Sequence, residues 1–107
     1  MASDKVLTLD GANFDSEISS DTPILVDFWA QWCGPCRMVA PVLGQLLVRI
    51  GKVDIDTHQE LAVRFGVSSI PTFLLFENGE VKDRMMGAMP KSAFESFLSK
   101  NLETATA

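Results

Sequence analysis

The stretch from Phe28 to Cys36, FWAQWCGPC, holds both cysteines of this chain of 107 residues. Glycine and proline separate the cysteines, and a tryptophan directly precedes the first one. Such a pair can be a structural crosslink, half of a metal site or a working dithiol. Because each use requires a different setting, the flanking sequence decides among them.

The residues before the cysteines predict a buried strand, and those after them predict a helix. Pro23 to Trp29 (PILVDFW) is apolar on both alternating faces, which is typical of a central strand covered on both sides. Only Asp27 interrupts it. The helix is expected to begin at Cys33 or the next residue and to end at Gly44, with Pro41 bending it because proline supplies no backbone donor.

Hydrophobic patterning predicts alternating strands and helices along the rest of the chain. Further strands are expected over Lys5 to Leu9, Leu46 to Asp56, Thr72 to Phe76 and Val81 to Met86, and further helices over Ala12 to Ser19, Thr57 to Gly66 and Lys91 to Asn101. Asp56 or Thr57 is the expected N-cap of the third helix, and Asn78-Gly79 predicts a hairpin. One α/β domain over residues 1–107 follows, with a mixed five-stranded sheet, helices on both faces and a frayed tail at 103–107.

Composition excludes several classes of function. The chain is 47% hydrophobic and 21% charged, which favours a folded globule. Its net charge is −5, and its nine basic residues are scattered along the sequence. We therefore expect no nucleic-acid role. The first residues, MASDKVLTLD, lack an export signal, and no apolar run is long enough to span a membrane. These features predict a cytoplasmic protein.

A cytoplasmic location favours a working dithiol over the two other uses. Cytosolic reductants keep thiols reduced, which argues against a purely structural disulfide. A closed zinc site needs four ligands, and the only other good candidate is His58, the single histidine. We expect His58 to be solvated on a surface helix, and we expect no metal and no bound cofactor.

The junction of strand and helix suits a reactive thiol. A thiol attacks a disulfide only as the thiolate, and unpaired amides and the helix dipole at a helix start favour negative charge. Cys33 is therefore the expected nucleophile, exposed to clients, and Cys36 the less exposed resolving thiol. Gly34 lets a client backbone approach closely, and Pro35 stiffens the first turn.

Three stretches, VDFWAQWCGPC, IPTFLLFENGE and MMGAMPK, resemble the thioredoxin family, and the likeness runs from about Asp4 to Leu102. The resemblance implies that the first cysteine attacks a target disulfide and the second resolves the mixed disulfide. It also places the family's buried aspartate at Asp27 and its partner lysine at Lys52. Burial should raise the pKa of Asp27 and the ammonium should counteract the rise. The hypothesis is that Asp27 takes the proton of Cys36 through water; the alternative is a satisfied core aspartate beside a lysine.

The segment SSIPT resembles the family's loop in which a cis-proline faces the dithiol, which maps to Ile70-Pro71. The alternative is an ordinary tight turn. In the first interpretation the backbone of Ile70 can pair with an extended client segment. The expected client-binding residues are Gly34, Pro35, Ile70, Pro71, Met86, Gly87 and Ala88, with Trp32 as a partly exposed lid. Met38 and Met85 are expected to fill gaps in or near the core.

The chain departs from the family between Leu43 and Lys52, where it has only GQLLVRIG. Thioredoxins continue the active-site helix for roughly two more turns, about 10 Å at 1.5 Å per residue. We place the deletion in the second half of this helix. Leu46, Leu47 and Ile50 are expected to help cover the gap, or a second copy covers it. A monomer is favoured, with a weak or swapped dimer as the alternative.

The predicted function is reduction of protein disulfides, with recycling by a thioredoxin reductase that uses NADPH, a partner implied by the resemblance. An oxidase or isomerase is a rival that the Gly-Pro spacer and the missing signal disfavour. A binding or scaffold subunit with incidental cysteines is a rival of another class. A scaffold predicts no turnover that depends on Cys33 in an insulin-reduction assay.

Overall fold

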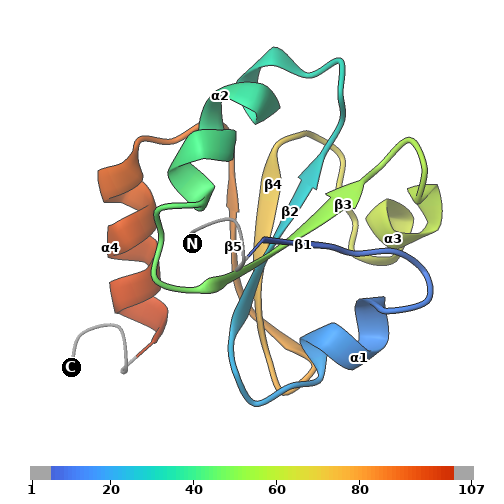
Figure 1. Ribbon diagram of the computed structural model, residues 1–107, viewed down its shortest axis with the longest axis horizontal. Coiled ribbons are helices and arrows are strands. Elements are labelled where there is room, and N and C mark those ends of the chain that lie inside the picture. The colour runs from blue at the N-terminus through green and yellow to red at the C-terminus, as the bar shows by residue number, and fades with distance from the viewer. Residues whose placement is uncertain (1–5, 103–107) are drawn as a thin grey trace.

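The computed structural model describes residues 6–102, which form one sheet with helices on both faces (Figure 1). In chain order the elements are β1 (Val6–Thr8), α1 (Phe14–Ile18), β2 (Ile24–Trp29), α2 (Gly34–Leu43), β3 (Arg49–Asp54), α3 (Gln59–Arg64), β4 (Thr72–Glu77), β5 (Glu80–Met86) and α4 (Lys91–Asn101). This order confirms the predicted one. The expected tail at 103–107 and the predicted start of the first strand at Lys5 lie outside the described residues.

The sheet is mixed, with strand order β1-β3-β2-β4-β5. β1, β3 and β2 run parallel, whereas β4 pairs antiparallel with β2 and with β5. β2 lies at the centre, and its residues from Ile24 to Phe28 are all buried, as the run of apolar residues predicted. Because β2 and β3 are parallel, the segments that follow them leave the sheet at the same edge.

Each face of the sheet carries its own hydrophobic core. α2 and α4 cover one face, where the rings of Phe73 and Phe94 meet edge to face at 4.9 Å. α1 and α3 cover the other face, where Phe14 and Phe76 meet in the same way at 5.9 Å. The apolar stripe of α4 is buried in the first core through Phe94, Phe97 and Leu98.

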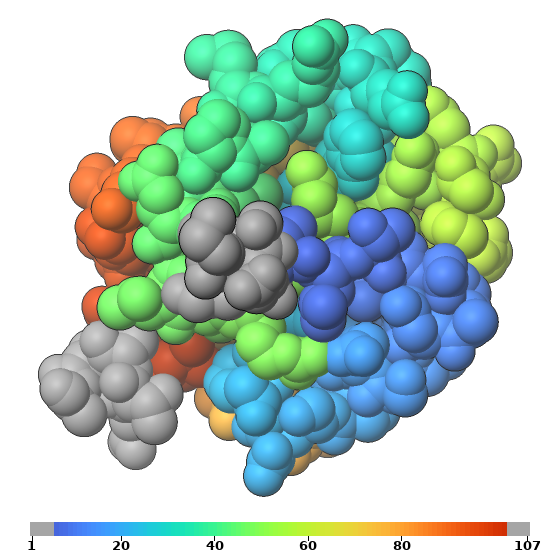
Figure 2. Space-filling model, viewed as in Figure 1, coloured from blue at the N-terminus to red at the C-terminus, as the bar shows by residue number. Residues whose placement is uncertain are grey.

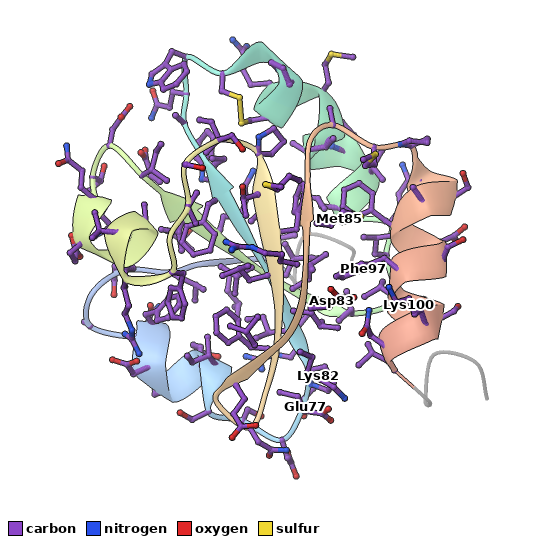
Figure 3. All side chains as sticks on the ribbon, turned by 180° about the vertical axis from the view of Figure 1, so that it is seen from behind. Glu77, Lys82, Asp83, Met85, Phe97 and Lys100 are labelled. Carbon is purple, nitrogen blue, oxygen red and sulfur yellow. A yellow bond between two sulfur atoms is a disulfide. The ribbon has the colours of Figure 1, made fainter. Side chains whose placement is uncertain are left out.

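Polar contacts join the C-terminal part of α4 to the edge strand β5 (Figure 3). The Asp83 carboxylate accepts a hydrogen bond of 3.0 Å from the Asn101 amide and lies 3.5 Å from the Lys100 ammonium. These donors, with the Asn101 bond as the largest cause, lower the pKa of Asp83. Met85 is half-buried against the core of α2 and α4, as predicted.

α2 ends at Leu43 with Gly44 as its C-cap and contains Pro41, as predicted. The buried face of α2 recurs at Cys36, Val39 and Leu43. Met38 lies off this face and is 74% exposed. The expectation that Met38 fills a gap in the core is therefore wrong.

The segment between α2 and β3 packs into the core that α2 and α4 cover. Its first amides, of Gln45 and Leu46, bond back to carbonyls in the last turn of α2, so β3 begins at Arg49 and not at Leu46. The segment runs beside α4 in Figures 1 and 2, and Leu46 shares a buried cluster with Phe97. Leu46 and Ile50 are thus buried as expected, whereas Leu47 is 90% exposed and covers nothing.

The turn before α3 differs from the prediction. The Asp54 carboxylate accepts the amides of Asp56 and Thr57, at 2.9 and 3.4 Å, and this turn delays the helix. His58 is the N-cap, without a side-chain capping bond, so the expected cap at Asp56 or Thr57 is wrong. Downstream, Gly66 has a φ of 64° beyond the helix end, and the hairpin residues Asn78 and Gly79 have φ of 57° and 82°.

The neighbouring leucines of the segment after α2 should differ sharply in a stability measurement. Leu46→Ala removes a buried side chain and should lower the free energy of unfolding by about 2 to 5 kcal/mol. Leu47→Ala, at a side chain that is 90% exposed, should change it by less than about 0.5 kcal/mol. Urea unfolding of both variants checks this, and equal effects would contradict the described packing.

Candidate active site

A disulfide joins Cys33 and Cys36 where the chain passes from β2 to α2, with the two Cα atoms 5.3 Å apart. Cys33 is the N-cap of α2, and its Sγ accepts a hydrogen bond of 3.2 Å from the Cys36 amide. Pro35 lies in the first turn, where a helix needs no amide donor. The helix start therefore directs an N–H at the sulfur of Cys33, as its predicted placement required.

The exposure of the cysteines follows the predicted order but not the predicted degree. Cys33 is 4% exposed and Cys36 is 1% exposed. The two sulfurs are bonded to each other, and Trp29, Ile55 and Ile70 pack around them. The expectation of an exposed Cys33 is therefore wrong for this disulfide form.

The loop before β4 faces the disulfide. Its Ile70-Pro71 bond is cis, as the resemblance implied. The Ile70 carbonyl oxygen lies 4.0 Å from Sγ of Cys33, and the Ile70 side chain packs against the buried cluster of Ala30 and the two cysteines. The loop is thus part of the site and is more than an ordinary tight turn.

The loop after β5 lies against the cis-proline loop. The Gly87 amide donates a hydrogen bond of 2.9 Å to the Pro71 carbonyl. Met86 pairs with Thr72 across the sheet, and its Sδ lies 3.7 Å from the Ser69 hydroxyl. Gly87 has a φ of 94°, which favours glycine, and Ala88 follows it on the surface. The structure therefore brings Met86 and Gly87 beside the loop that faces the disulfide.

The exposed surface beside the disulfide is apolar. Trp32 is 69% exposed and Met86 is 53% exposed. Gly34 and Pro35, in the first turn of α2, are exposed as well. We call the predicted client-binding residues the docking rim; they are Trp32, Gly34, Pro35, Ile70, Pro71, Met86, Gly87 and Ala88.

One residue that contacts this rim was not predicted from the sequence. The Trp32 indole Nε1 donates a hydrogen bond of 2.8 Å to Oδ2 of Asp56, which was expected only as a helix cap. Trp32 follows β2 and Asp56 follows β3. A signal did exist, since parallel neighbouring strands place the segments after them at the same edge, but it requires knowing that β2 and β3 are neighbours.

Asp27 is completely buried in β2, and its backbone pairs in register with Lys52 of β3. The Lys52 Nζ lies 3.9 Å from Oδ2, and neither carboxylate oxygen accepts a hydrogen bond from any residue of 6–102. Burial raises the pKa of Asp27 from 3.8 to about 7, although the Lys52 ammonium acts in the opposite direction. A carboxyl group with this pKa can accept or release a proton near neutral pH.

Lys52 connects this buried carboxylate to the protein surface. Its ammonium lies 4.5 Å from the centre of the Trp29 ring. The side chain also lines a pocket of about 250 Å³ together with Thr8, Leu9, Trp29, Asp54, Thr57 and His58. His58 is half-buried here, with Nδ1 3.7 Å from a Glu60 oxygen, so it is less solvated than expected. The pocket has room for water beside the ammonium.

Comparisons with known proteins agree with this geometry. The family model described as thioredoxin matches residues 5–100. This chain belongs to the thioredoxin family. Thioredoxin of Haemophilus influenzae is 45% identical over 105 residues, which cover 92% of this chain and 98% of the relative. Thioredoxin of Alicyclobacillus acidocaldarius subsp. acidocaldarius is 43% identical over 103 residues, 91% of this chain and 98% of the relative. The protein named thioredoxin M5, chloroplastic, of Oryza sativa subsp. japonica is 42% identical over 104 residues, 91% of this chain and 60% of that protein.

Membership of the thioredoxin family makes the chain a thiol-disulfide oxidoreductase that reduces disulfides of substrate proteins. Its redox-active disulfide is the one between Cys33 and Cys36. Within residues 6–102, no helix is long and apolar enough to cross a membrane. Over the same residues, no cluster of three or more histidine, cysteine or acidic side chains is arranged to hold a metal ion.

The thioredoxin relatives are longer than this chain inside the matched region. The match with the Haemophilus influenzae protein runs over 105 positions, whereas 92% of this chain is only about 98 residues. About seven positions of that relative thus have no counterpart here, which amounts to about two helical turns at 3.6 residues per turn. This agrees in size with the deletion that we place after Leu43.

The buried carboxyl group should make stability depend on pH. The folded chain keeps the Asp27 proton up to a pKa of about 7, whereas the unfolded chain releases it near 3.8. Between these values the unfolded state binds fewer protons, so the free energy of unfolding falls as pH rises. Relative to Asp27→Ala, wild type should lose roughly 4 kcal/mol between about pH 4 and about pH 8.

Urea unfolding of the oxidised proteins across this pH range measures the difference. Asp21→Ala, at an exposed carboxylate, serves as the matched control and should keep the wild-type pH dependence. A constant difference between wild type and Asp27→Ala would show that Asp27 carries the same charge in the folded and unfolded states.

Proposed function

We propose that Cys33 and Cys36 reduce client disulfides in two steps, and that a thioredoxin reductase returns them to the dithiol with electrons from NADPH. The observation that carries this proposal is the position of the Cys33 sulfur, at the start of α2 and facing the cis-proline loop. This position combines an amide donor for the thiolate with an apolar surface for the client.

In the first step the Cys33 thiolate attacks one sulfur of the client disulfide. A bond forms between Cys33 and the attacked client sulfur, the client disulfide breaks, and the other client sulfur leaves as a thiolate that takes a proton from water. The Cys36 amide, 3.2 Å from the Cys33 sulfur, and the helix dipole favour the thiolate. The docking rim holds the client by apolar contact, with the backbone of Ile70 available to an extended segment.

In the second step Cys36 attacks Cys33 and releases the client. Cys36 must first lose its proton, and we propose that Asp27 accepts this proton through water. A carboxylate with a pKa of about 7 is matched to this task, and Lys52 limits the rise in that pKa. The bond between Cys33 and the client breaks and the Cys33–Cys36 disulfide of the structure forms. The client sulfur leaves as a thiolate and takes a proton from water to become the second thiol, and Asp27 returns its proton to water.

In this proposal the reductase supplies the two electrons for the next cycle, so the chain needs no bound cofactor of its own. We place this cycle in a reducing compartment, the cytoplasm, where NADPH can keep the dithiol reduced. We further propose that the chain works as a monomeric single domain. The burial of Leu46 and Ile50 supports this, because they cover within one chain part of the gap beside α2.

Insulin reduction tests the roles of the two cysteines. Wild type should precipitate reduced insulin both with dithiothreitol and with NADPH and thioredoxin reductase, whereas Cys33→Ser should lose turnover in both assays. Cys36→Ser should accumulate a mixed disulfide because nothing resolves it. Turnover by Cys33→Ser equal to wild type would contradict the mechanism and favour a scaffold. Activity with dithiothreitol but not with NADPH and thioredoxin reductase would contradict only the proposed recycling partner.

Asp27 should act on the second step and not on the first. In stopped-flow measurements near neutral pH, Asp27→Ala should slow release of the client from the mixed disulfide by roughly 10²-fold or more, as expected for loss of a general base. Formation of the mixed disulfide should change much less, since Cys33 has its own amide donor. Equal slowing of both steps would remove Asp27 from the mechanism.

A further inference from the structure

The segment after β3 forms a wall of the active site. The Ile55 amide donates a hydrogen bond of 3.0 Å to the Trp29 carbonyl, and the Ile55 side chain packs against the buried cluster that Ala30 forms with the two cysteines. The next residue, Asp56, accepts the 2.8 Å hydrogen bond from the indole of Trp32. This wall and the cis-proline loop both border the disulfide.

The turn and the bond to Trp32 depend on different side chains. Asp54 holds the turn by accepting the amides of Asp56 and Thr57. Within the described part of the chain, the hydrogen bond from Trp32 is the only one that the Asp56 carboxylate makes. The Asp56 side chain therefore serves Trp32 and not the local fold, which separates its effect from that of Asp54.

We propose that Asp56 is a specificity-determining residue for disulfide reduction. It fixes the indole of Trp32 beside Cys33, and its carboxylate favours clients that carry a positive charge next to the attacked disulfide. The inference rests on the proposed docking rim, because it assumes that clients contact Trp32.

The positioning effect follows from the exposure of the indole. Trp32 is 69% exposed and so has few packing contacts that select one rotamer. A hydrogen bond of ordinary net strength shifts the equilibrium among the rotamers of Trp32 roughly 2- to 10-fold, and a hydrogen bond to a carboxylate lies toward the upper end of this range. A fixed indole presents a preformed apolar surface, which lowers the ordering cost that a client must meet on binding.

The charge effect follows from the composition of the docking rim. All eight rim residues are uncharged, so the exposed carboxylate of Asp56 is the charge in hydrogen-bonding contact with the rim. For a client cation about 6 Å from this carboxylate in water, the attraction raises the reduction rate roughly threefold, and for an anion the repulsion lowers the rate by about as much. Added salt should weaken this preference.

The test uses pre-reduced protein and three synthetic disulfide peptides that differ only in the residue beside one cysteine, which is Lys, Gln or Glu. Each reaction moves two electrons and two protons from the dithiol to the peptide and leaves the Cys33–Cys36 disulfide. Second-order rate constants are measured for wild type, Asp56→Asn and Asp56→Ala. Glu80→Gln, an exposed carboxylate at the far end of the sheet, is the charge control.

Wild type and Glu80→Gln should prefer Lys over Gln and Gln over Glu, by roughly threefold at each step at low salt. Asp56→Asn keeps a hydrogen-bond acceptor but not the charge, so it should reduce all three peptides at the wild-type rate for the Gln peptide. Asp56→Ala should also reduce the Gln peptide roughly 2- to 10-fold more slowly. In a Trp32→Phe background that slowing should vanish, because the donor is gone.

Two results would overturn the inference. One is an unchanged charge preference in Asp56→Asn. The other is equal rates for Asp56→Ala and Asp56→Asn with the Gln peptide. Failure of wild type to reduce even the Gln peptide would instead refute the proposed function, and circular dichroism of each variant confirms that the fold is intact.

Discussion

The central position of β2 is the constraint on which the site depends. The strand is buried between two helical layers and pairs with β3 on one side and β4 on the other. Its last residues must therefore leave the sheet at an edge where a helix can begin. That exit places Cys33 at the N-cap of α2, and the same burial places Asp27 where its carboxyl group is costly to ionise.

Parallel pairing of β2 with β3 extends this constraint to the rest of the site. It sets Lys52 beside Asp27 and brings Asp56 to the edge where Trp32 lies. Antiparallel pairing of β2 with β4 places the cis-proline loop at the same edge, because β4 begins where β2 ends. One strand and its two neighbours thus bring together the cysteine pair, the buried acid and the proposed docking rim.

The short α2 keeps the geometry of the cysteine pair for a physical reason. The cysteines occupy the first turn, and the amide donor to the Cys33 sulfur comes from Cys36 within that turn. We place the deletion in the far half of the helix, away from this turn, and Leu46 and Ile50 lie in the core that α2 and α4 cover. Leu47, which patterning grouped with them, is exposed because the chain reverses direction there before entering β3.

Local patterns along the sequence determined the order of elements, the hairpin at Asn78-Gly79, the stop at Gly44 and the cysteine pair at a helix start, because each follows from preferences within a few residues. Resemblance added Asp27, Lys52 and the cis bond at Pro71. Only the tertiary structure decided the low exposure of Cys33, the outward position of Met38 and the bond between Trp32 and Asp56. These features depend on which strands are neighbours and on what packs across the gap, and such contacts join residues too far apart in the chain for any local pattern to encode.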